Sequence, residues 1–355
     1  MMMLGAGSAT YPAIPEIWLA ASACLILMID VYGGHRHRGV TATATMLALL
    51  IGAVLISMFG MVMTRTLLFH GLFVADALGT FLKLAAFVTM ATAIFYSQEY
   101  LEQRAMVGGE YYVLCLTGLL GVFVLISANS MLTVYLGIEL LSLSLYALVA
   151  FDRDNGIAAE AAIKYFVLGA IASGALLYGM SMLYGMTGTL DLDTLSAIVR
   201  HGSDDGVIIG IAFIVAAVAF KFGAVPFHMW VPDVYQGAPT SVTLFIATVS
   251  NLGSFALIAR LLSHGLAGLP LVWTQMVLAV AVASLLIGNI VAIAQTNLKR
   301  MLAYSAIANA GFVLLGFSTG QAVGYQAALN FTIAYVLTTL AAFGLILVLS
   351  RRGFE

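Results

Sequence analysis

The stretch AAVAFKFGAVPFHMWVPDVYQGAPT, residues 216–240, decides how this chain folds. It begins as an apolar helix pattern that contains Lys221, and two prolines, Pro226 and Pro232, follow within a few residues. A proline removes a backbone amide donor and breaks a helix unless the freed carbonyl groups find other partners. We therefore expect a helix broken near residues 221–237, with a lysine inside the apolar run beside the break.

The rest of the chain shares the apolar character of this stretch. Of the 355 residues, 62% are hydrophobic and only 8% are charged. Soluble domains carry about 25% charged residues, so the composition excludes a soluble enzyme, a disordered chain and a coiled coil. The net charge of −2 gives no electrostatic attraction to nucleic acid or to anionic headgroups. In lipid, a broken helix is tolerated only where it is packed in protein or lines a water-filled cavity.

Apolar runs of about 20 residues, the length that crosses a bilayer as a helix, recur along the chain. They predict an all-α polytopic membrane protein with roughly 11 transmembrane helices. Long runs with helical periodicity argue against a β-barrel, whose strands alternate over about ten residues. No Lys or Arg precedes the first run and no small-residue cleavage site follows it, so we expect it to stay as a helix. The expected spans are 15–32, 40–63, 73–97, 111–127, 130–150, 159–186, 207–226, 240–262, 271–294, 301–318 and 322–350.

The positive charges of the connecting loops differ between the two sides of the membrane. One set of alternate loops holds Arg36, Arg38, Arg104, Arg153, Lys164, Lys299, Arg300, Arg351 and Arg352. The other set holds Arg65, Arg200 and Arg260. Because cytoplasmic loops carry the excess of Lys and Arg, we expect the N-terminus outside the cell and the C-terminus in the cytoplasm. The long loop 187–206 is then an external connector, with a short amphipathic helix around Leu190–Val199.

The sequence holds no pattern typical of a cofactor or metal site. Its two cysteines, Cys24 and Cys115, lie in separate apolar runs, with no CxxC motif and no Cys/His cluster. This excludes an iron–sulfur cluster, a structural zinc and a disulfide framework. No GxGxxG or GxxxxGK[ST] motif follows a strand pattern, so nucleotide binding is unsupported as well.

Glu139 is one of the ionisable residues at bilayer depth, where each charge costs about 2.5–3.5 kcal/mol on insertion scales. It lies near the middle of the fifth span, and helical spacing places it on one stripe with Tyr135, Ser142 and Tyr146. The opposite face is Leu, Ile and Val, so this stripe faces other helices or water. A structural hydrogen bond to a neighbouring helix is one interpretation, and a functional carboxylate is the one we favour.

Lys221, in the seventh span, is the second such residue. Desolvation disfavours the charge of a lysine and a nearby carboxylate favours it, so Lys221 and Glu139 can form a switch set by their separation. This makes Lys221 a candidate for proton transfer. The alternative is a lysine that extends to the cytoplasmic edge, since Lys221 lies in the last turns of its span.

Three further ionisable residues allow two interpretations each. Lys164, at the start of the sixth span, either loads protons or anchors its helix at the membrane edge. His228, at the helix break, either relays protons or satisfies exposed backbone carbonyls. For Lys83, in the third span, we expect extension to the outer edge or a structural ion pair with Asp76.

Neutral polar stripes follow the tenth and eleventh spans. They comprise Tyr304, Ser305, Ala308 and Asn309 in the tenth, and Thr332, Tyr335, Thr338 and Thr339 in the eleventh. Hydroxyls and amides at this spacing can hold a chain of water molecules, and they equally serve as contacts between helices. The stripes therefore support a pathway without proving one.

Four stretches of the sequence resemble one known family. They are KFGAVPFHMWVPDVYQGAPTSVT (221–243), LGIELLSLSLYALVAF (136–151), EAAIKYFVLGAIASGALLYGMSMLYGMTGTLDL (160–192) and QTNLKRMLAYSAIANAGFVLLG (295–316). They are similar to the antiporter-like membrane subunits of bacterial NADH-quinone oxidoreductase, the respiratory complex I. The VPDVYQGAPT form resembles subunit N of that enzyme more than its other antiporter-like subunits. The matching motifs cover about residues 75–350.

The resemblance implies a proton channel built from two inverted five-helix repeats, in which a lysine–glutamate pair feeds a hydrated central axis. By position, Glu139 matches the family's fifth-span glutamate, Lys221 its broken-helix lysine, and Lys164 its sixth-span lysine. Quinone reduction elsewhere in the complex would drive the charge movements. Partner subunits would bind NADH, FMN, the iron–sulfur clusters and the quinone. This chain would contact other membrane subunits in the bacterial inner membrane.

The chain departs from the family pattern in two ways. In the eighth span, FIATVSNLGSF has Asn251 where the family usually places a lysine on the central axis, and an amide cannot hold a transferable charge. The family also has about 14 spans against roughly 11 here, so we expect the second repeat to be incomplete. The expected division is N-terminal helices (1–110), a first repeat (111–265) and a partial second repeat (266–355).

The interpretation we favour is a proton-translocating membrane subunit of an NADH:quinone reductase, with no cofactor site of its own. One alternative is a subunit of an Mrp-type cation/proton antiporter. A second is a solute transporter with a broken-helix site, although the sequence shows no carboxylate- or amine-recognition cluster for a substrate. A third is a truncated, non-pumping structural remnant, which Asn251 and the missing spans keep open.

Overall fold

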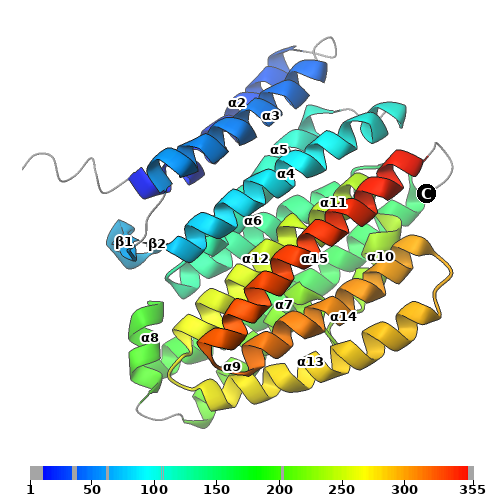
Figure 1. Ribbon diagram of the computed structural model, residues 1–355. Coiled ribbons are helices and arrows are strands. Elements are labelled where there is room, and N and C mark those ends of the chain that lie inside the picture. The colour runs from blue at the N-terminus through cyan, green and yellow to red at the C-terminus, as the bar shows by residue number, and fades with distance from the viewer. Residues whose placement is uncertain are drawn as a thin grey trace, which may run out of the picture.

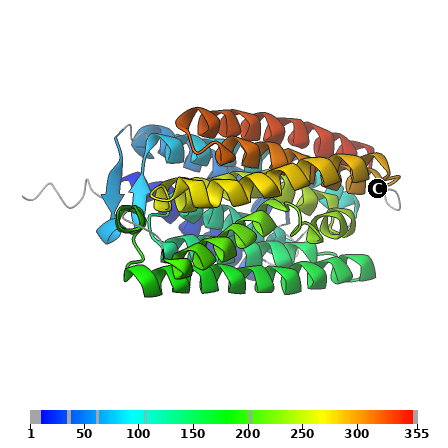
Figure 2. The same cartoon turned by 90° about the horizontal axis from the view of Figure 1, so that it is seen from below.

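The computed structural model describes residues 11–33, 38–60, 64–104, 106, 108–200 and 204–350. Within these residues, eleven helices are long and apolar enough to cross a membrane, as the sequence predicts. They lie side by side in a tilted bundle (Figure 1; Figure 2). The one sheet in the described residues is a two-stranded hairpin at one end of this bundle.

The first three spans and the hairpin form one side of the bundle. The elements are η1 (Tyr11–Ala13), α2 (Ile14–Gly33), α3 (Arg38–Leu55), η3 (Ile56–Gly60), β1 (Thr66–Leu68), η4 (Phe69–Gly71), β2 (Phe73–Ala75) and α4 (Ala77–Gln103). The strands pair antiparallel, with Thr66 opposite Ala75 and Leu68 opposite Phe73. The Asp76 side chain begins α4 by accepting a hydrogen bond from the Gly79 amide at 2.7 Å, as an N-cap does.

The next helices are α5 (Gly109–Ile126), α6 (Met131–Val149), α7 (Gly156–Thr187) and the short α8 (Leu192–Val199). Polar residues begin three of them: Ser130 with Thr133 forms a capping box at α6, Asn155 caps α7, and Asp191 caps α8. The short helix expected around Leu190–Val199 is therefore present as α8.

The predicted broken helix comprises α9 (Asp205–Phe222) and the short α10 (Trp230–Gly237). Gly223 ends α9 in the left-handed conformation, with φ of 67°, which glycine adopts without strain. The polar backbone groups at the break find partners in the protein. The Trp230 indole donates to the Phe220 carbonyl oxygen at 2.9 Å, and the Val225 amide donates to Ser284 Oγ at 2.9 Å. These two backbone groups are thus satisfied within the protein, as a membrane interior requires, while Phe227 and Met229 of the break are exposed.

The eighth span, expected as one helix over 240–262, is divided. It consists of α11 (Thr240–Ala247), α12 (Val249–Ile258) and the π-helical η5 (Ala259–Gly265). The two α-helices meet at Thr248, whose φ of −120° and ψ of −78° are not helical. Its hydroxyl donates to the Leu244 carbonyl oxygen at 2.5 Å, so the side chain competes for a backbone acceptor. This span is the most buried of the eleven and packs against α4, α5, α9 and α15.

The last three spans are α13 (Pro270–Ile293), α14 (Leu298–Ser318) and α15 (Ala322–Leu349). Helices α13 and α14 pack on each other, and α15 returns across the bundle to contact α4 and α11. Large apolar side chains such as Leu271 and Ile293 of α13 are exposed, which suits a surface that faces lipid.

The two ends of the bundle differ in structure and in charge. One end carries β1, β2 and α8 and is called the hairpin end; the opposite end carries α10 and is called the α10 end (Figure 1). Arg65 and Arg200 lie at the hairpin end, whereas Arg104, Arg153, Lys164, Lys299 and Arg300 lie at the α10 end. Arg36, Arg351 and Arg352 lie outside the described residues, and the structure does not describe the side chain of Arg38.

Candidate functional site

Lys221 lies in the last turn of α9 and is only 8% exposed. Its Nζ donates a hydrogen bond to Ser142 Oγ of α6 at 3.1 Å, so the side chain turns into the bundle instead of extending to an edge. Because the Val225 amide is bound to Ser284, the Lys221 carbonyl loses its helical donor; it accepts a hydrogen bond from Ser254 of α12 at 3.4 Å. Helices α6 and α12 therefore bind this lysine beside the break, and α13 binds the nearby Val225 amide.

Glu139 lies on the same face of α6 as Ser142, one turn earlier, as helical spacing predicts. It is half-buried, and its Oε1 accepts a hydrogen bond from Ser173 of α7 at 2.5 Å. Lys221 of α9 thus reaches the face of α6 that carries Glu139. Each of the two residues is bound to a serine rather than directly to the other. Sequence reasoning found Ser142 but missed Ser173 and Ser254, because helical periodicity does not identify partners on other helices.

A small cavity of about 20 Å³ lies beside Lys221 and Ser173, the serine that binds Glu139. Its polar lining comes from Ser142, Tyr146, Ser173 and Lys221, and the rest is apolar. A polar cavity needs about 10–15 Å³ to hold one water molecule. One water therefore fits between the lysine of α9 and the serine that binds Glu139, which makes this spot suitable for proton transfer.

His228 and Asn251 both follow Lys221 in the sequence. Asn251 of α12 is half-buried, and its Nδ2 donates to the Ala247 carbonyl oxygen at 2.6 Å, within its own helix. His228 is half-buried in the connection between α9 and α10. Its Nδ1 is buried without a hydrogen-bond partner in the described part of the chain.

Lys164 lies apart from the Lys221 pair, at the α10 end. Its Nζ forms ion pairs with Glu160 Oε1 at 2.8 Å, on its own helix, and with Asp233 Oδ2 at 2.9 Å, on α10. Burial alone would raise the pKa of Asp233, but hydrogen bonds from Lys164 and Arg300 hold it below its ordinary value. Sequence reasoning missed Asp233, whose position beside Pro232 in the broken helix was the only available signal.

The expected ion pair between Lys83 and Asp76 is wrong. Lys83, 5% exposed, pairs at 2.5 Å with Glu16 Oε1 of α2. Asp76 instead binds Arg260 through both carboxylate oxygens, at 2.6 and 2.9 Å. Arg260 was assigned to a loop, but it lies in η5 and is 7% exposed. The partners come from distant helices, and only the folded bundle brings them together.

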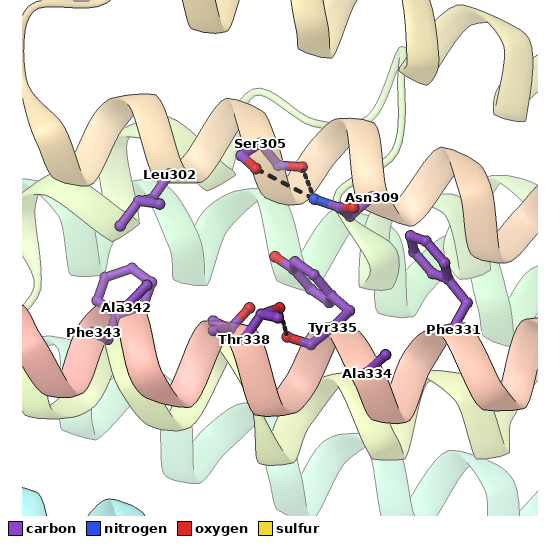
Figure 3. A pocket seen from close by; sticks show the side chains of 10 residues that line it. Leu302, Ser305, Asn309, Phe331, Ala334, Tyr335, Thr338, Ala342 and Phe343 are labelled. Carbon is purple, nitrogen blue, oxygen red and sulfur yellow. Dashed lines mark hydrogen bonds between the residues drawn. The ribbon is translucent and has the colours of Figure 1, made fainter.

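A groove of about 350 Å³ lies between α14 and α15 (Figure 3). Figure 3 shows Ser305 and Asn309 of α14 opposite Tyr335 and Thr338 of α15. The Asn309 amide donates to the Ser305 carbonyl oxygen at 2.8 Å, and the Thr338 hydroxyl donates to the Tyr335 carbonyl oxygen at 2.9 Å. The two predicted polar stripes therefore face each other here.

The described residues contain no group of three or more His, Cys, Asp or Glu side chains that could hold a metal ion. Lys83, Lys164 and Arg260 occur instead in ion pairs, and Glu139 and Lys221 are each bound to a serine hydroxyl. This arrangement is suited to moving protons and holding helices together.

The comparison with known proteins identifies the family of this chain. The family described as NADH:quinone oxidoreductase/Mrp antiporter, TM, matches residues 128–354. The NADH-quinone oxidoreductase subunit N of Nitrosomonas europaea is 50% identical, over 97% of this chain and 72% of its own length. The chain belongs to the NADH-quinone oxidoreductase subunit N family. The subunit N of Thioalkalivibrio sulfidiphilus has the same identity and the same coverage. The family expected from the four motifs is confirmed.

Solved structures show the same architecture. A chain of respiratory complex I from Thermus thermophilus matches with a TM-score of 0.79 and 30% identity, over 94% of this chain and 70% of that chain. A chain of the archaeal membrane-bound sulfane sulfur reductase matches with a TM-score of 0.77 and 26% identity, over 95% and 69%. A chain of the Mrp complex from Dietzia sp. has a TM-score of 0.79 at 18% identity, over 95% and 64%, and shows the fold alone. The subunit N family and the eleven candidate spans make this chain a multi-pass membrane protein with the antiporter-like fold.

Proposed function

We propose that this chain is a proton-translocating membrane subunit of NADH-quinone oxidoreductase, in which quinone reduction drives protons across the membrane. The observation that carries the proposal is the 50% identity, over 97% of the chain, to proteins named as subunit N of that enzyme. A lysine buried beside a broken helix, within reach of a carboxylate on a neighbouring helix, is the site chemistry that such a subunit needs.

Lys221 carries the proton in this proposal. Its hydrogen bond to Ser142 and the adjoining cavity give it a short route to one water molecule. The negative charge of Glu139 stabilises the ammonium form, and desolvation favours the neutral amine. Glu139 of α6 is held by the Ser173 hydroxyl of α7. A change in the charge of Glu139 therefore shifts Lys221 between keeping and releasing its proton.

The other candidate residues extend this route in both directions. Lys164 would load protons at the α10 end, where it is exposed to solvent. His228 would relay them across the break, because its Nδ1 is free to bind a donor. On the central axis, Asn251 cannot carry a charge, so water and hydroxyl groups would carry the proton past it. The groove of α14 and α15, lined by Ser305, Asn309 and Tyr335, offers such groups.

The rest of the assembly follows from the same proposal. Other membrane subunits of the complex would pack on this chain, and NADH, FMN, the iron–sulfur clusters and the quinone would be bound by partner subunits. The membrane would be the bacterial inner membrane, with the N-terminus outside and the α10 end in the cytoplasm, in accord with the cations at that end. Residues 1–110 would form an N-terminal unit, 111–265 the first repeat and 266–355 part of the second.

An Mrp-type antiporter subunit is the alternative of the same fold. The likeness to the Mrp complex of Dietzia sp. is 18% in identity, which supports the fold and no shared activity. Sodium-dependent growth of cells that carry this chain, without NADH-driven proton uptake, would favour that alternative.

The test replaces Lys221 by Met and, separately, Glu139 by Gln in the assembled complex. NADH-driven quinone reduction and proton uptake into inverted vesicles are recorded together. We expect both rates to fall about tenfold or more, as when a group that transfers protons is removed. Glu99→Gln is the matched control, because this exposed carboxylate on α4 binds only a neighbouring glutamine in the described residues, and it should leave both rates unchanged.

Assembly is checked first by the amount of intact complex in the membrane. Wild-type rates in an assembled Lys221→Met complex would contradict the proposal, since the lysine would then be structural. The chain would in that case be a non-pumping scaffold, the third alternative left by the sequence.

A further inference from the structure

Asp233 of α10 binds two cations that come from two different helices. Its Oδ2 pairs with Lys164 Nζ of α7 at 2.9 Å, and its Oδ1 pairs with Arg300 Nη1 of α14 at 2.9 Å. Arg300 also donates to Gln236 Oε1, one turn further along α10, at 3.1 Å. Each oxygen of one carboxylate therefore serves a different helix.

The short helix that carries Asp233 is itself fixed between α7 and α14. Trp230 stacks on Tyr165, the neighbour of Lys164, with ring centroids 4.6 Å apart. On the other side, Lys299 Nζ donates to the Ala238 carbonyl oxygen at 2.9 Å. Asp233 thus has little freedom to move away from Lys164. The position of α10 therefore determines where the Lys164 side chain points.

Lys164 has a second carboxylate partner that does not cross between helices. Glu160 lies one turn earlier on α7 and pairs with Lys164 at 2.8 Å, but its side chain is 65% exposed, against 31% for Asp233. Exposed pairs of this i,i+4 kind hold a side chain only weakly. Without Asp233, Lys164 would keep a partner of opposite charge but lose its link to the broken helix.

We propose that Asp233 is a positioning residue, which holds the Lys164 ammonium at the mouth of the proton route and is itself held in place by Arg300. The inference rests on the proposed role of Lys164 as the residue that loads protons. In this proposal the Asp233 carboxylate of the broken helix fixes the position of Lys164 and does not itself carry the proton.

The experiment measures NADH-driven proton uptake by inverted vesicles that carry the assembled complex. Asp233→Asn should lower the uptake about fivefold, the order expected from the loss of a partly exposed charge pair. Asp233→Glu keeps the charge and should recover most of the uptake. Glu160→Gln is the matched control; it removes the other carboxylate from Lys164 and should leave the uptake within about twofold of wild type.

A double variant separates positioning from stability. If Asp233 acts through Lys164, the pair Lys164→Ala and Asp233→Asn together should be no slower than Lys164→Ala alone. A double variant that is clearly slower than Lys164→Ala would overturn the proposal, because Asp233 would then act elsewhere. So would an Asp233→Asn complex that matches Glu160→Gln while Lys164→Ala is impaired.

Failure of the proposed function has a different outcome. Wild-type uptake in Lys164→Ala would remove Lys164 from the route, and the positioning role with it. If Asp233→Asn does not assemble, the test moves to Arg300→Gln, which keeps the Lys164–Asp233 pair but frees one carboxylate oxygen. We expect its uptake to lie between those of wild type and Lys164→Ala, and a wild-type value would overturn the proposal.

Discussion

Buried charges occur in this protein where a second helix supplies the partner. Glu16 of α2 pairs with Lys83 of α4, and the same carboxylate oxygen accepts a hydrogen bond from Ser127 at 3.1 Å. The Lys83 ammonium also lies 4.9 Å from the centroid of the Phe73 ring, where a cation is attracted to the ring face. The pair therefore joins the first span to the third without reaching water.

Removing one member of this pair should be costly. Lys83→Met leaves the Glu16 carboxylate buried and uncompensated, which we expect to lower the free energy of unfolding by about 3–5 kcal/mol. The combined change of Lys83→Met and Glu16→Met should recover most of this loss, because an apolar pair of similar size fits a buried site. Thermal unfolding of the detergent-solubilised protein gives the measurement. A double variant no more stable than the single one would contradict the argument.

At this scale, sequence reasoning found the charged residues but not their partners. The stripe on α6 correctly placed Glu139 beside Ser142, since both lie on one helix and helical spacing is fixed. Ser173, Ser254 and Glu16 were missed as partners because each comes from another helix. Which helices become neighbours depends on the packing of the whole bundle.

Single helices were easier to predict, because hydropathy reports the length that crosses a bilayer. The expected span 111–127 is α5, Gly109–Ile126, and the break after α9 followed from its prolines. The division of the eighth span at Thr248 could not be predicted in the same way. Threonine is common within helices, and its hydroxyl opens the backbone here only in the packed environment of the bundle.

A close approach between two spans gives a test of helix packing. A Cβ atom on Gly121 of α5 would lie 2.5 Å from the Leu141 backbone nitrogen of α6, which cannot move aside easily. We expect Gly121→Ala to lower the free energy of unfolding by about 1–3 kcal/mol through overpacking. Gly174→Ala on α7 is the matched control, since a Cβ there meets nothing within 4 Å. That variant should be neutral or up to about 1 kcal/mol more stable.

Thermal unfolding of the two glycine variants in the same detergent provides the comparison. Equal midpoints for Gly121→Ala and Gly174→Ala would show that α5 and α6 are not in close backbone contact.

Over the whole molecule, the structure corrects the charge difference on which the orientation rests. Arg260, counted among the cations of the sparser loop set, is buried against Asp76 and Ile126 and so is no loop charge. Arg65 and Arg200 then remain at the hairpin end within the described residues. Lys299 is buried in the same way, so four cations remain at the α10 end: Arg104, Arg153, Lys164 and Arg300. The positive-inside rule concerns loop charges, so the difference that remains still favours the α10 end in the cytoplasm.

Labelling from each side of the membrane tests this orientation. Asp154, in the loop before α7 at the α10 end, and Asp204, before α9 at the hairpin end, are both exposed and can each be changed to cysteine. The exposed native thiol is first removed by Cys24→Ser, and Cys115 can stay because it is buried. A membrane-impermeant maleimide should then label Asp154→Cys in inverted vesicles and Asp204→Cys in right-side-out spheroplasts. The reverse pattern would place the hairpin end in the cytoplasm, and Lys164 would then face the side to which protons are delivered instead of the side from which they are loaded.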